Sequence, residues 1–568
     1  CHGSKLRPEA MSVYLIAEHT VAEKPTKKKT PVVAPGMIYA QDIAEKYSIY
    51  DLQTLPLREL IVVLDRYREV AKWPEQLVKR ILKPLIERVR TITGLGWWFL
   101  ETIRKVESLS GGEIQRLRLA KQLGNKLTGI IYVLDEPTIG LDIAEIEKVI
   151  IAVRQLQQMG NTIVVVEHND EFIKASDWIV EIGPGAGDFG GHVEFSGEFT
   201  DFVKQDTLTA QYVSGRKKVQ ATFDHTPMKE YVEIAQASQH NLQNISVKIQ
   251  LGSFTIITWW SGAGKTTLMY HTLFKFLSEK QQFVQSFVRL HLLKKWLSRQ
   301  DIIKNPVLQR TEYEQLERQA LEAFYEHLHV KKITGTEHIE NVQYVDQSSI
   351  GKTPRSCPAT FIWVFDDMRK LYAGATEAKM LWFTAGHFSF NSGKWACPEC
   401  NWYGTKLIEL QFLPDTYVDC ELCRGRRYKP EILDIKWHGK SISELLEMYV
   451  FDALDFFQDI GFIREKLQLM VDIGLWYLRM GQPAHTLSWG ESQRLKLVKH
   501  LLKQYKGHTV YFLDEPTVGL HPSDIERLLK VLKKFLDNGD TVLMIEHEKN
   551  LLQFADKVII LEEGKVVK

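Results

Sequence analysis

Short apolar runs alternate with longer amphipathic segments along much of this chain. The runs at 130–134 and 162–166, for example, flank the segment AEIEKVIIAVRQLQQMG, whose apolar residues recur with the period of a helix. Continuous apolar runs of this length are typical of strands buried on both faces, and such strands are usually parallel and joined by crossover helices. The pattern therefore predicts an α/β fold with buried, mixed or parallel sheets.

The same pattern occurs twice. SLSGGEIQRLRLAKQL, early in the chain, aligns with TLSWGESQRLKLVKHL near its end. Each stretch is followed by an apolar run that ends in Asp-Glu-Pro-Thr, and then by another that ends in Glu-His. The separation between Glu136 and His168 equals that between Glu515 and His547. A repeat of this kind predicts two homologous modules in tandem.

A different pattern lies between the two modules. Residues 273–332 are rich in charge and carry Leu316, Ala320, Phe324 and Leu328 at a spacing of four. Residues at this spacing share one face of a helix. We therefore expect a helical insertion whose apolar face packs into a core.

Charge and cysteine usage narrow the candidate chemistry. The 72 Lys and Arg residues balance 71 Asp and Glu residues, so a nucleic-acid surface, if present, must be local. Four of the 6 cysteines form two CxxC pairs, Cys397 with Cys400 and Cys420 with Cys423. This spacing predicts a closed structural zinc site, whereas Cys357 is expected to be a packing residue. We find no apolar run long enough for a bilayer, and expect a cytoplasmic protein without membrane partners.

The stretch SFTIITWWSGAGKTTL has the order strand, glycine-rich turn, Gly-Lys-Thr-Thr and helix. Gly262 and Gly264 allow backbone N–H groups to face a phosphate, Lys265 would reach the β and γ phosphates, and Thr266 would bind Mg²⁺. The full pattern asks for glycine where this chain has Trp259. If that position needs a positive φ, tryptophan costs about 1 kcal/mol or more there.

Two adjacent carboxylates follow an apolar run in the second module. We expect Asp514 to hold Mg²⁺ and Glu515 to orient or deprotonate an attacking water. His547, at the end of the neighbouring run, would sense the γ phosphate. These residues predict an ATP-hydrolysing site.

The signature Leu-Ser-Gly-Gly-Glu with Gln-Arg following, the Walker B run and the later histidine resemble ABC-type ATPases. More specifically, the chain resembles the UvrA family of the bacterial excinuclease. The matching stretches cover nearly the whole chain outside the helical insertion and include GNKLTGIIYVLDEPTIGLD, EIGPGAGDFGGHV, VDQSSIGKTPRSCPATF, FSFNSGKWACPEC and FLPDTYVDCELCRGRRY. The resemblance implies tandem ABC-type ATPase modules with helical signature subdomains and a zinc-binding hook.

In this family each ATP site combines the Walker A of one half with the signature of the other. The resemblance implies one complete site, with Glu515 and His547 as catalytic residues. Its ATP-binding residues would be Gly262, Gly264, Lys265, Thr266, Thr267, Gln347 and Asp514, closed by Ser110, Gly111, Gly112 and Glu113. The other site would be closed by Ser488, Trp489 and Gly490. Because Trp489 replaces a glycine that approaches phosphate, we expect that site to be inactive and Asp135, Glu136 and His168 to be structural.

The resemblance also implies partners. The expected function is recognition of damaged duplex DNA in nucleotide excision repair, within the SOS response, with ATP, Mg²⁺ and Zn²⁺ as cofactors. A UvrB-type helicase is the family's partner, and a homodimer is its usual state. Arg424, Arg426 and Arg427, beside the zinc ligands, are candidate contacts to DNA phosphates, although a solvated charged turn is an equal alternative. Trp402 stands where the family tends to have glycine.

The resemblance divides the chain into segments. We expect the end of a first ABC module at 1–215, the start of a second with Walker A at 216–272, the helical insertion at 273–332, the Q-loop region at 333–390, the zinc hook at 391–430, and signature and Walker B at 431–568. CHGSKLRPEA resembles a stretch that follows a CxxC pair in the family. Cys1 is therefore expected to end such a pair, and the first Walker A and the UvrB-binding domain would lie upstream.

Two other functions remain open at this stage. The chain could be a DNA-binding or scaffolding protein in which Trp259 abolishes turnover, or a UvrA-like paralogue that confers drug resistance. Lys265 and Glu515 favour the enzyme, whereas Trp259 and Trp489 favour the binding protein.

Overall fold

The computed structural model forms two units, Cys1–Ser176 and Asp177–Lys568, which are described separately. The described residues are 14–16, 46–70, 75–94, 96–97, 100–105, 117, 119–121, 128–138, 141, 143–185, 187–259, 262–298, 306–346, 350–351, 355–389, 393–408, 416–503 and 505–567.

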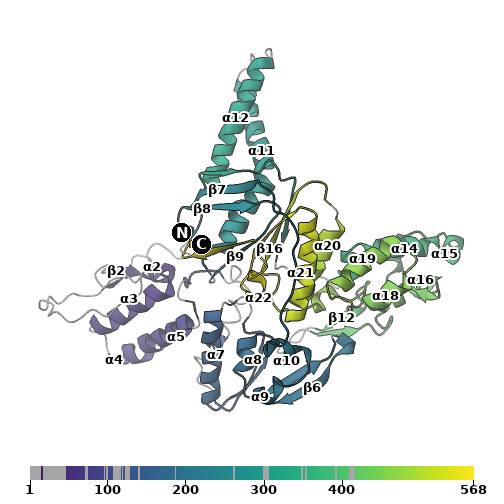
Figure 1. Cartoon of the computed structure of the whole chain (residues 1–568), viewed down its shortest axis with the longest axis horizontal. Coiled ribbons are helices and arrows are strands. Elements are labelled where there is room, and N and C mark those ends of the chain that lie inside the picture. Colours follow the sequence, from purple (N-terminus) through teal and green to yellow (C-terminus); the bar gives the residue numbers. More distant parts are fainter. Residues whose placement is uncertain are drawn as a thin grey trace, which may run out of the picture. The chain divides into compact units, whose positions relative to one another are not determined.

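A six-stranded sheet forms the centre of the second unit (Figure 1). Five neighbouring strands are parallel and the last is antiparallel. In spatial order they are β11 (Asn341–Val345), β16 (Thr509–Asp514), β17 (Thr541–Ile545), β9 (Phe254–Thr258), β18 (Lys557–Glu562) and β19 (Lys565–Val566). Strands β9, β16 and β17 are buried on both faces, as their continuous apolar sequences predict.

Two apolar clusters cover the two faces of this sheet. Because side chains alternate along a strand, neighbours in β16 enter different clusters. Leu513 packs in the cluster that includes α21 (Pro522–Asp537). Phe512 packs in the cluster of η4 (Thr267–Phe274) and of an antiparallel sheet with the order β10 (Lys332–Thr334), β7 (Tyr231–Ala237) and β8 (Ile245–Gln250).

Two long helices lie in the range of the expected insertion, α11 (Lys275–Ser298) and α12 (Pro306–His327). They lie side by side (Figure 1). Phe276 of α11 stacks on Phe324 of α12 with ring centroids 5.8 Å apart, and Phe283 stacks on the same ring at 4.6 Å. Phe276 and Phe324 also belong to the cluster under β16, so the base of the helix pair is continuous with the sheet core.

A helical region and several short strand pairs complete the second unit. The helices and turns are η3 (Gly187–Phe189), α9 (Phe199–Phe202), α10 (Leu208–Val213), α13 (Pro358–Phe361), α14 (Val364–Gly374), α15 (Thr376–Met380), η6 (Gly393–Trp395), α16 (Pro430–Leu433), α17 (Ile442–Glu447), α18 (Val450–Phe456), α19 (Gly461–Asp472), η7 (Ala484–Thr486), α20 (Trp489–Leu502) and α22 (Lys549–Leu552). The paired strands are β5 (Ile179–Gly183) with β6 (His192–Gly197), β12 (Thr405–Ile408) with β13 (Thr416–Asp419), and β14 (Lys436–Trp437) with β15 (Lys440–Ser441).

The first unit contains a helical part and a small parallel sheet. Its elements are β1 (Tyr14–Ile16), β2 (Lys46–Ser48), α2 (Ile49–Thr54), α3 (Leu57–Val70), α4 (Glu75–Leu77), η1 (Val78–Leu82), α5 (Lys83–Gly94), β3 (Ile131–Asp135), α7 (Ile143–Gln158), β4 (Thr162–Val166) and α8 (Asp170–Lys174). Strands β3 and β4 pair in parallel on either side of the crossover helix α7. The predicted α/β fold class is thus confirmed.

The sequence repeat is also a structural repeat. β3 pairs with β4 in the register by which β16 pairs with β17: Leu134 lies opposite Val165, and Leu513 opposite Met544. The surroundings differ, because Phe512 is fully buried whereas Val133, at the corresponding position, is 70% exposed. The same local structure therefore has an apolar covering in the second module that the described residues do not supply in the first.

Asp540 provides a test of this repeat. Its Oδ1 accepts the Thr509 N–H at 2.9 Å, just as Asn161 Oδ1 accepts the Ile130 N–H at 3.0 Å. Burial raises the pKa of Asp540 to about 6. Because a raised carboxyl pKa means that the folded state binds the proton more tightly, stability is lost as the pH rises from about 4 through about 6.

We predict that Asp540→Asn, which copies Asn161, removes this loss and raises the free energy of unfolding by about 1 kcal/mol above pH 7. Urea denaturation at pH 5 and pH 7.5 measures the difference. Asp537→Asn, at an exposed position, should leave the pH dependence unchanged. Parallel pH profiles for Asp540→Asn and the unchanged chain would contradict the prediction.

Candidate functional site

The glycine-rich turn connects the end of β9 to the helix η4. Gly262 has φ 79° and Gly264 has φ 102°, values that favour glycine. A Cβ atom on Gly264 would lie only 2.8 Å from Leu242 Cδ2. Lys265 is 6% exposed, and its Nζ donates to the carbonyl of Trp259 at 2.6 Å. The lysine therefore reaches back to the residue that directly follows β9.

Trp259 has φ 117°. Because this φ is positive, tryptophan is costly at this position. The value lies well outside the small left-handed region that non-glycine residues visit. The two threonines after the lysine differ in exposure: Thr266 is exposed and Thr267 is half-buried.

Asp514 and Glu515 lie at the carboxyl end of β16, beside the end of β17. Asp514 Oδ2 accepts the Tyr344 hydroxyl at 3.1 Å, and its carbonyl accepts Gln493 Nε2 at 3.0 Å. Burial, followed by the charge of Glu515, raises the pKa of Asp514 to about 7. Lys265 acts in the opposite direction on this pKa. The loop lysine and the carboxylates therefore occupy one edge of the sheet.

Glu515 adopts φ 46° and donates its backbone N–H to the Ile545 carbonyl at 3.0 Å. This turn directs its carboxylate toward His547, whose Nε2 lies 3.6 Å from Glu515 Oε1. Both side chains are largely buried. This arrangement is the one expected of a general base, Glu515, and of a histidine that positions it, His547.

Glu546 is a structural residue that the sequence reasoning did not single out. It is 2% exposed and accepts the backbone N–H groups of His547 at 2.9 Å, Glu548 at 3.3 Å and Thr517 at 3.3 Å. Burial raises its pKa to about 7. Its carboxylate thus connects the turn after β16 to the turn after β17. The Glu-His pair that ends an apolar run in both modules is the sequence signal that could have identified Glu546.

The first module preserves this arrangement. Glu167 accepts the N–H groups of Thr138 and His168 at 3.0 and 2.9 Å, and Glu136 adopts φ 44°. The Glu136 N–H donates to the Val166 carbonyl at 2.9 Å. The first-module carboxylates therefore retain the geometry of the second, including the left-handed turn.

Several predicted residues lie outside the described part of the chain. These are the Q-loop candidate Gln347 and the first signature, Ser110, Gly111, Gly112 and Glu113. The second signature is described at its start, where Ser488 caps α20 in a capping box with Glu491. Cys1 also falls outside the described residues.

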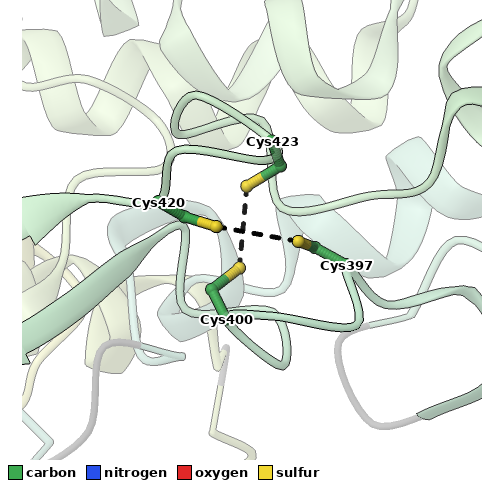
Figure 2. Close-up of side chains that lie close together, drawn as sticks. All are labelled: Cys397, Cys400, Cys420 and Cys423. Carbon is green, nitrogen blue, oxygen red and sulfur yellow. Dashed lines mark hydrogen bonds between the residues drawn. The ribbon is translucent and has the colours of Figure 1, made fainter.

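The four paired cysteines meet at one point (Figure 2). The Sγ atoms of Cys397 and Cys420 are 3.8 Å apart, those of Cys400 and Cys423 are 3.6 Å apart, and all four lie within 4.8 Å of one another. All four side chains are buried. Four converging sulfur atoms fit a tetrahedral zinc ion with no open position.

The turns after the two CxxC pairs have the same backbone. The two residues that follow Cys400 have φ 46° and 76°, and those that follow Cys423 have φ 49° and 78°. The second of these residues is Trp402 in one turn and Gly425 in the other. Trp402 is 2% exposed, and its ring meets Tyr428 edge-to-face at 4.9 Å.

Hydrogen bonds connect the two turns to each other. The Cys397 N–H donates to the Arg427 carbonyl at 3.0 Å, and the Cys420 N–H donates to the Gly404 carbonyl at 2.8 Å. Burial raises the pKa of the Cys400 and Cys420 thiols, whereas at Cys397 burial is outweighed by backbone hydrogen bonds from Cys400 and Glu399, which lower the pKa. The site thus fits a cation that would offset the cost of four buried thiolates.

The three arginines after this turn do not share one surface. Arg424 and Arg426 are exposed, whereas Arg427 is 5% exposed and donates from Nη2 to the Gly481 carbonyl at 2.6 Å. Arg427 is thus engaged within the protein, whereas Arg424 and Arg426 remain the exposed candidates for DNA phosphates. The Arg427 guanidinium holds the cysteine turn against the helical region.

Among the described residues, no helix is both long and apolar enough to cross a membrane.

Comparisons with known proteins extend these observations. No family model matches the chain. The chain is 41% identical to UvrABC system protein A of Aquifex aeolicus (strain VF5) over 99% of its own length and 54% of that protein. It is 38% identical to UvrABC system protein A of Bacillus subtilis (strain 168) over 99% of its length and 52% of that protein.

A solved structure is similar as well. UvrA2 from Deinococcus radiodurans matches with a TM-score of 0.77 and 35% identity, over 92% of this chain and 61% of that one. The chain spans about half the length of the curated relatives it matches. The resemblance indicated by the motifs is thus confirmed: nearly the whole of this chain is UvrA-like, and it corresponds to about half of a UvrA protein.

Proposed function

We propose that this chain is the ATP-hydrolysing part of a UvrA-type protein that binds damaged duplex DNA in nucleotide excision repair. The observation that carries the proposal is the meeting of Lys265, Asp514, Glu515 and His547 at one edge of the central sheet. The curated relatives from Aquifex aeolicus, Thermus thermophilus and Bacillus subtilis, each a UvrABC system protein A, support it.

Each residue has a role in this proposal. Lys265, which now donates to a loop carbonyl, would turn to the β and γ phosphates. Thr266 and Asp514 would hold Mg²⁺, which neutralises charge on the phosphates when bound. Glu515 would accept a proton from the attacking water, and His547 would position its carboxylate.

The first signature, 110–113, would close the site over the nucleotide. At the matching position of the second signature, Ser488 caps the start of α20, and the start of a helix favours an anion. The segments expected from the sequence, from the module end at 1–215 to the last module part at 431–568, remain the proposed division of the chain. A UvrB-type partner and a homodimer are part of the same proposal.

One observation favours a second candidate. Trp259 occupies the phosphate-binding loop with φ 117°. A chain unable to bind ATP there would be a DNA-binding scaffold. ATP binding therefore decides between the two functions.

We predict that Lys265→Ala abolishes Mg²⁺-ATP binding, because the phosphates lose their cation. Glu515→Gln should keep binding but lower hydrolysis about 10²–10⁴-fold, because the water loses its base. Calorimetry and phosphate release measure the two effects. Lys506→Ala, at an exposed position beyond the other end of β16, is the matched control. Equal ATP binding by the unchanged chain and Lys265→Ala would rule out this site.

For DNA, we predict that Arg424→Glu and Arg426→Glu each weaken duplex binding and reduce the slope of log affinity against log salt by about one. Fluorescence anisotropy with intact and lesion-bearing duplexes at several salt concentrations measures both. Lys204→Glu reverses a similarly exposed charge far along the chain and should have no effect. An unchanged salt slope would remove these arginines from the DNA surface.

For the metal, we predict that Cys400→Ser lowers zinc content from about one ion per chain to none, because three thiolates leave the tetrahedral site incomplete. Elemental analysis of the purified protein measures the content. Cys357→Ala should retain zinc, because Cys357 is buried away from the cluster. Zinc retained at full content in Cys400→Ser would contradict a four-cysteine site.

A further inference from the structure

Within the described ranges, four tryptophans have a backbone that suits glycine. They are Trp259 (φ 117°), Trp363 (φ 60°), Trp382 (φ 56°) and Trp402 (φ 76°). Bulky side chains are rare outliers at positive φ. The chain has 26 phenylalanines and 20 tyrosines, and none of those in the described ranges has a positive φ. In the described ranges, the other non-glycine residues with positive φ are polar or charged, so tryptophan is the one large apolar residue type found there.

Trp382 occupies the glycine position of a helix-ending motif. Helix α15 ends with Leu381 as its cap, so Trp382 is the first residue beyond it. The Trp382 N–H donates to the Lys379 carbonyl at 3.2 Å, and the Phe383 N–H donates to the Ala378 carbonyl at 2.8 Å. These two bonds define the Schellman motif, whose left-handed residue is usually glycine. The Trp382 side chain is 87% exposed, so burial does not offset its strain.

Trp363 occupies the corresponding position after α13. Ile362 caps that helix, and the Trp363 N–H donates to the Thr360 carbonyl at 3.3 Å. Two helices, α13 and α15, therefore end on a left-handed tryptophan.

The internal symmetry of the zinc site identifies a third position. Trp402 and Gly425 are the second residues after their CxxC pairs, with φ 76° and 78°. Their neighbours donate equivalent hydrogen bonds: Tyr403 N–H to the Cys400 carbonyl and Arg426 N–H to the Cys423 carbonyl, both at 3.0 Å. One turn of the pair thus has glycine where the other has tryptophan.

The two nucleotide motifs show the same exchange. Trp259 lies where the phosphate-loop pattern asks for glycine. In the second signature, Ser-Trp-Gly replaces the Ser-Gly-Gly of the first, so Trp489 corresponds to Gly111. These positions are unrelated in structure and share only the replacement of glycine by tryptophan.

We propose that the natural protein carries glycine at positions 259, 363, 382, 402 and 489. A single cause accounts for all five, because the codon UGA is read as tryptophan in one genetic code and as glycine in another. The phosphate loop would then have the complete pattern Gly-x-x-x-x-Gly-Lys-Thr, and the second signature would read Ser-Gly-Gly.

The proposal changes the expected nucleotide chemistry. Both signatures would be able to approach phosphate, so the second signature would close a working site in a complete UvrA-type protein. The indole at 259 would no longer stand against ATP binding. This consequence rests on the function proposed above, whereas the residue identities rest on the backbone and the two internal repeats.

Peptide mass spectrometry of the protein isolated from its natural source tests the proposal directly. We expect masses that correspond to glycine at all five positions. At Trp437, whose own φ is negative and whose ring stacks on Phe457, we expect the mass of tryptophan. Tryptophan at any of the five positions would overturn it. This measurement does not depend on nucleotide binding.

Thermal unfolding of the chain that has tryptophan at these five positions gives a second test. Trp382→Gly should raise the Tm, because the left-handed strain is relieved and little burial is lost. Trp178→Gly, at an exposed position outside the positive-φ set, should lower it. An unchanged or lower Tm for Trp382→Gly would contradict the proposal.

ATP binding by Trp259→Gly separates the two proposals. Absence of binding in this variant would remove the ATPase proposal, while the measured masses would still decide the identity of residue 259.

Discussion

The burial of the central sheet between two apolar layers is the constraint on which the rest of the second unit depends. Strands β9, β16 and β17 have no solvent face, and their one charged residue, Asp514, lies at a strand end. Because the strands are parallel, their carboxyl ends meet at one edge. This edge gathers the loop lysine and the carboxylates from segments far apart in the chain.

Burying charged groups at this edge costs free energy, and hydrogen bonds to the carboxylates offset part of that cost. The pKa values of Asp514 and Glu546 rise to about 7 because burial disfavours their ionised forms. Glu546 offsets part of that cost by accepting three backbone N–H groups. The same carboxylate also holds together the turns that carry Glu515 and His547, and so helps to set the geometry of this edge.

The duplicated modules separate local from global effects. Glu136 and Glu515 adopt nearly the same φ, and both strand pairs have the same register, although only the second pair is covered on the face of Phe512. Local sequence is therefore sufficient for the turn and the pairing. Solvent exposure of that face depends on what else packs there.

The sequence by itself determined the α/β class, the repeat, the glycine-rich turn, the paired carboxylates and the two cysteine pairs, because each follows from short-range periodicity or fixed spacing. Only the tertiary structure decided that Arg427 is buried whereas Arg424 is exposed, since neighbours in a tight turn point in different directions. It alone showed Glu546 connecting two strand ends, because that contact joins residues distant in the chain. It also showed the left-handed backbone at Trp363 and Trp382, since φ reflects how a helix ends rather than which side chain is present.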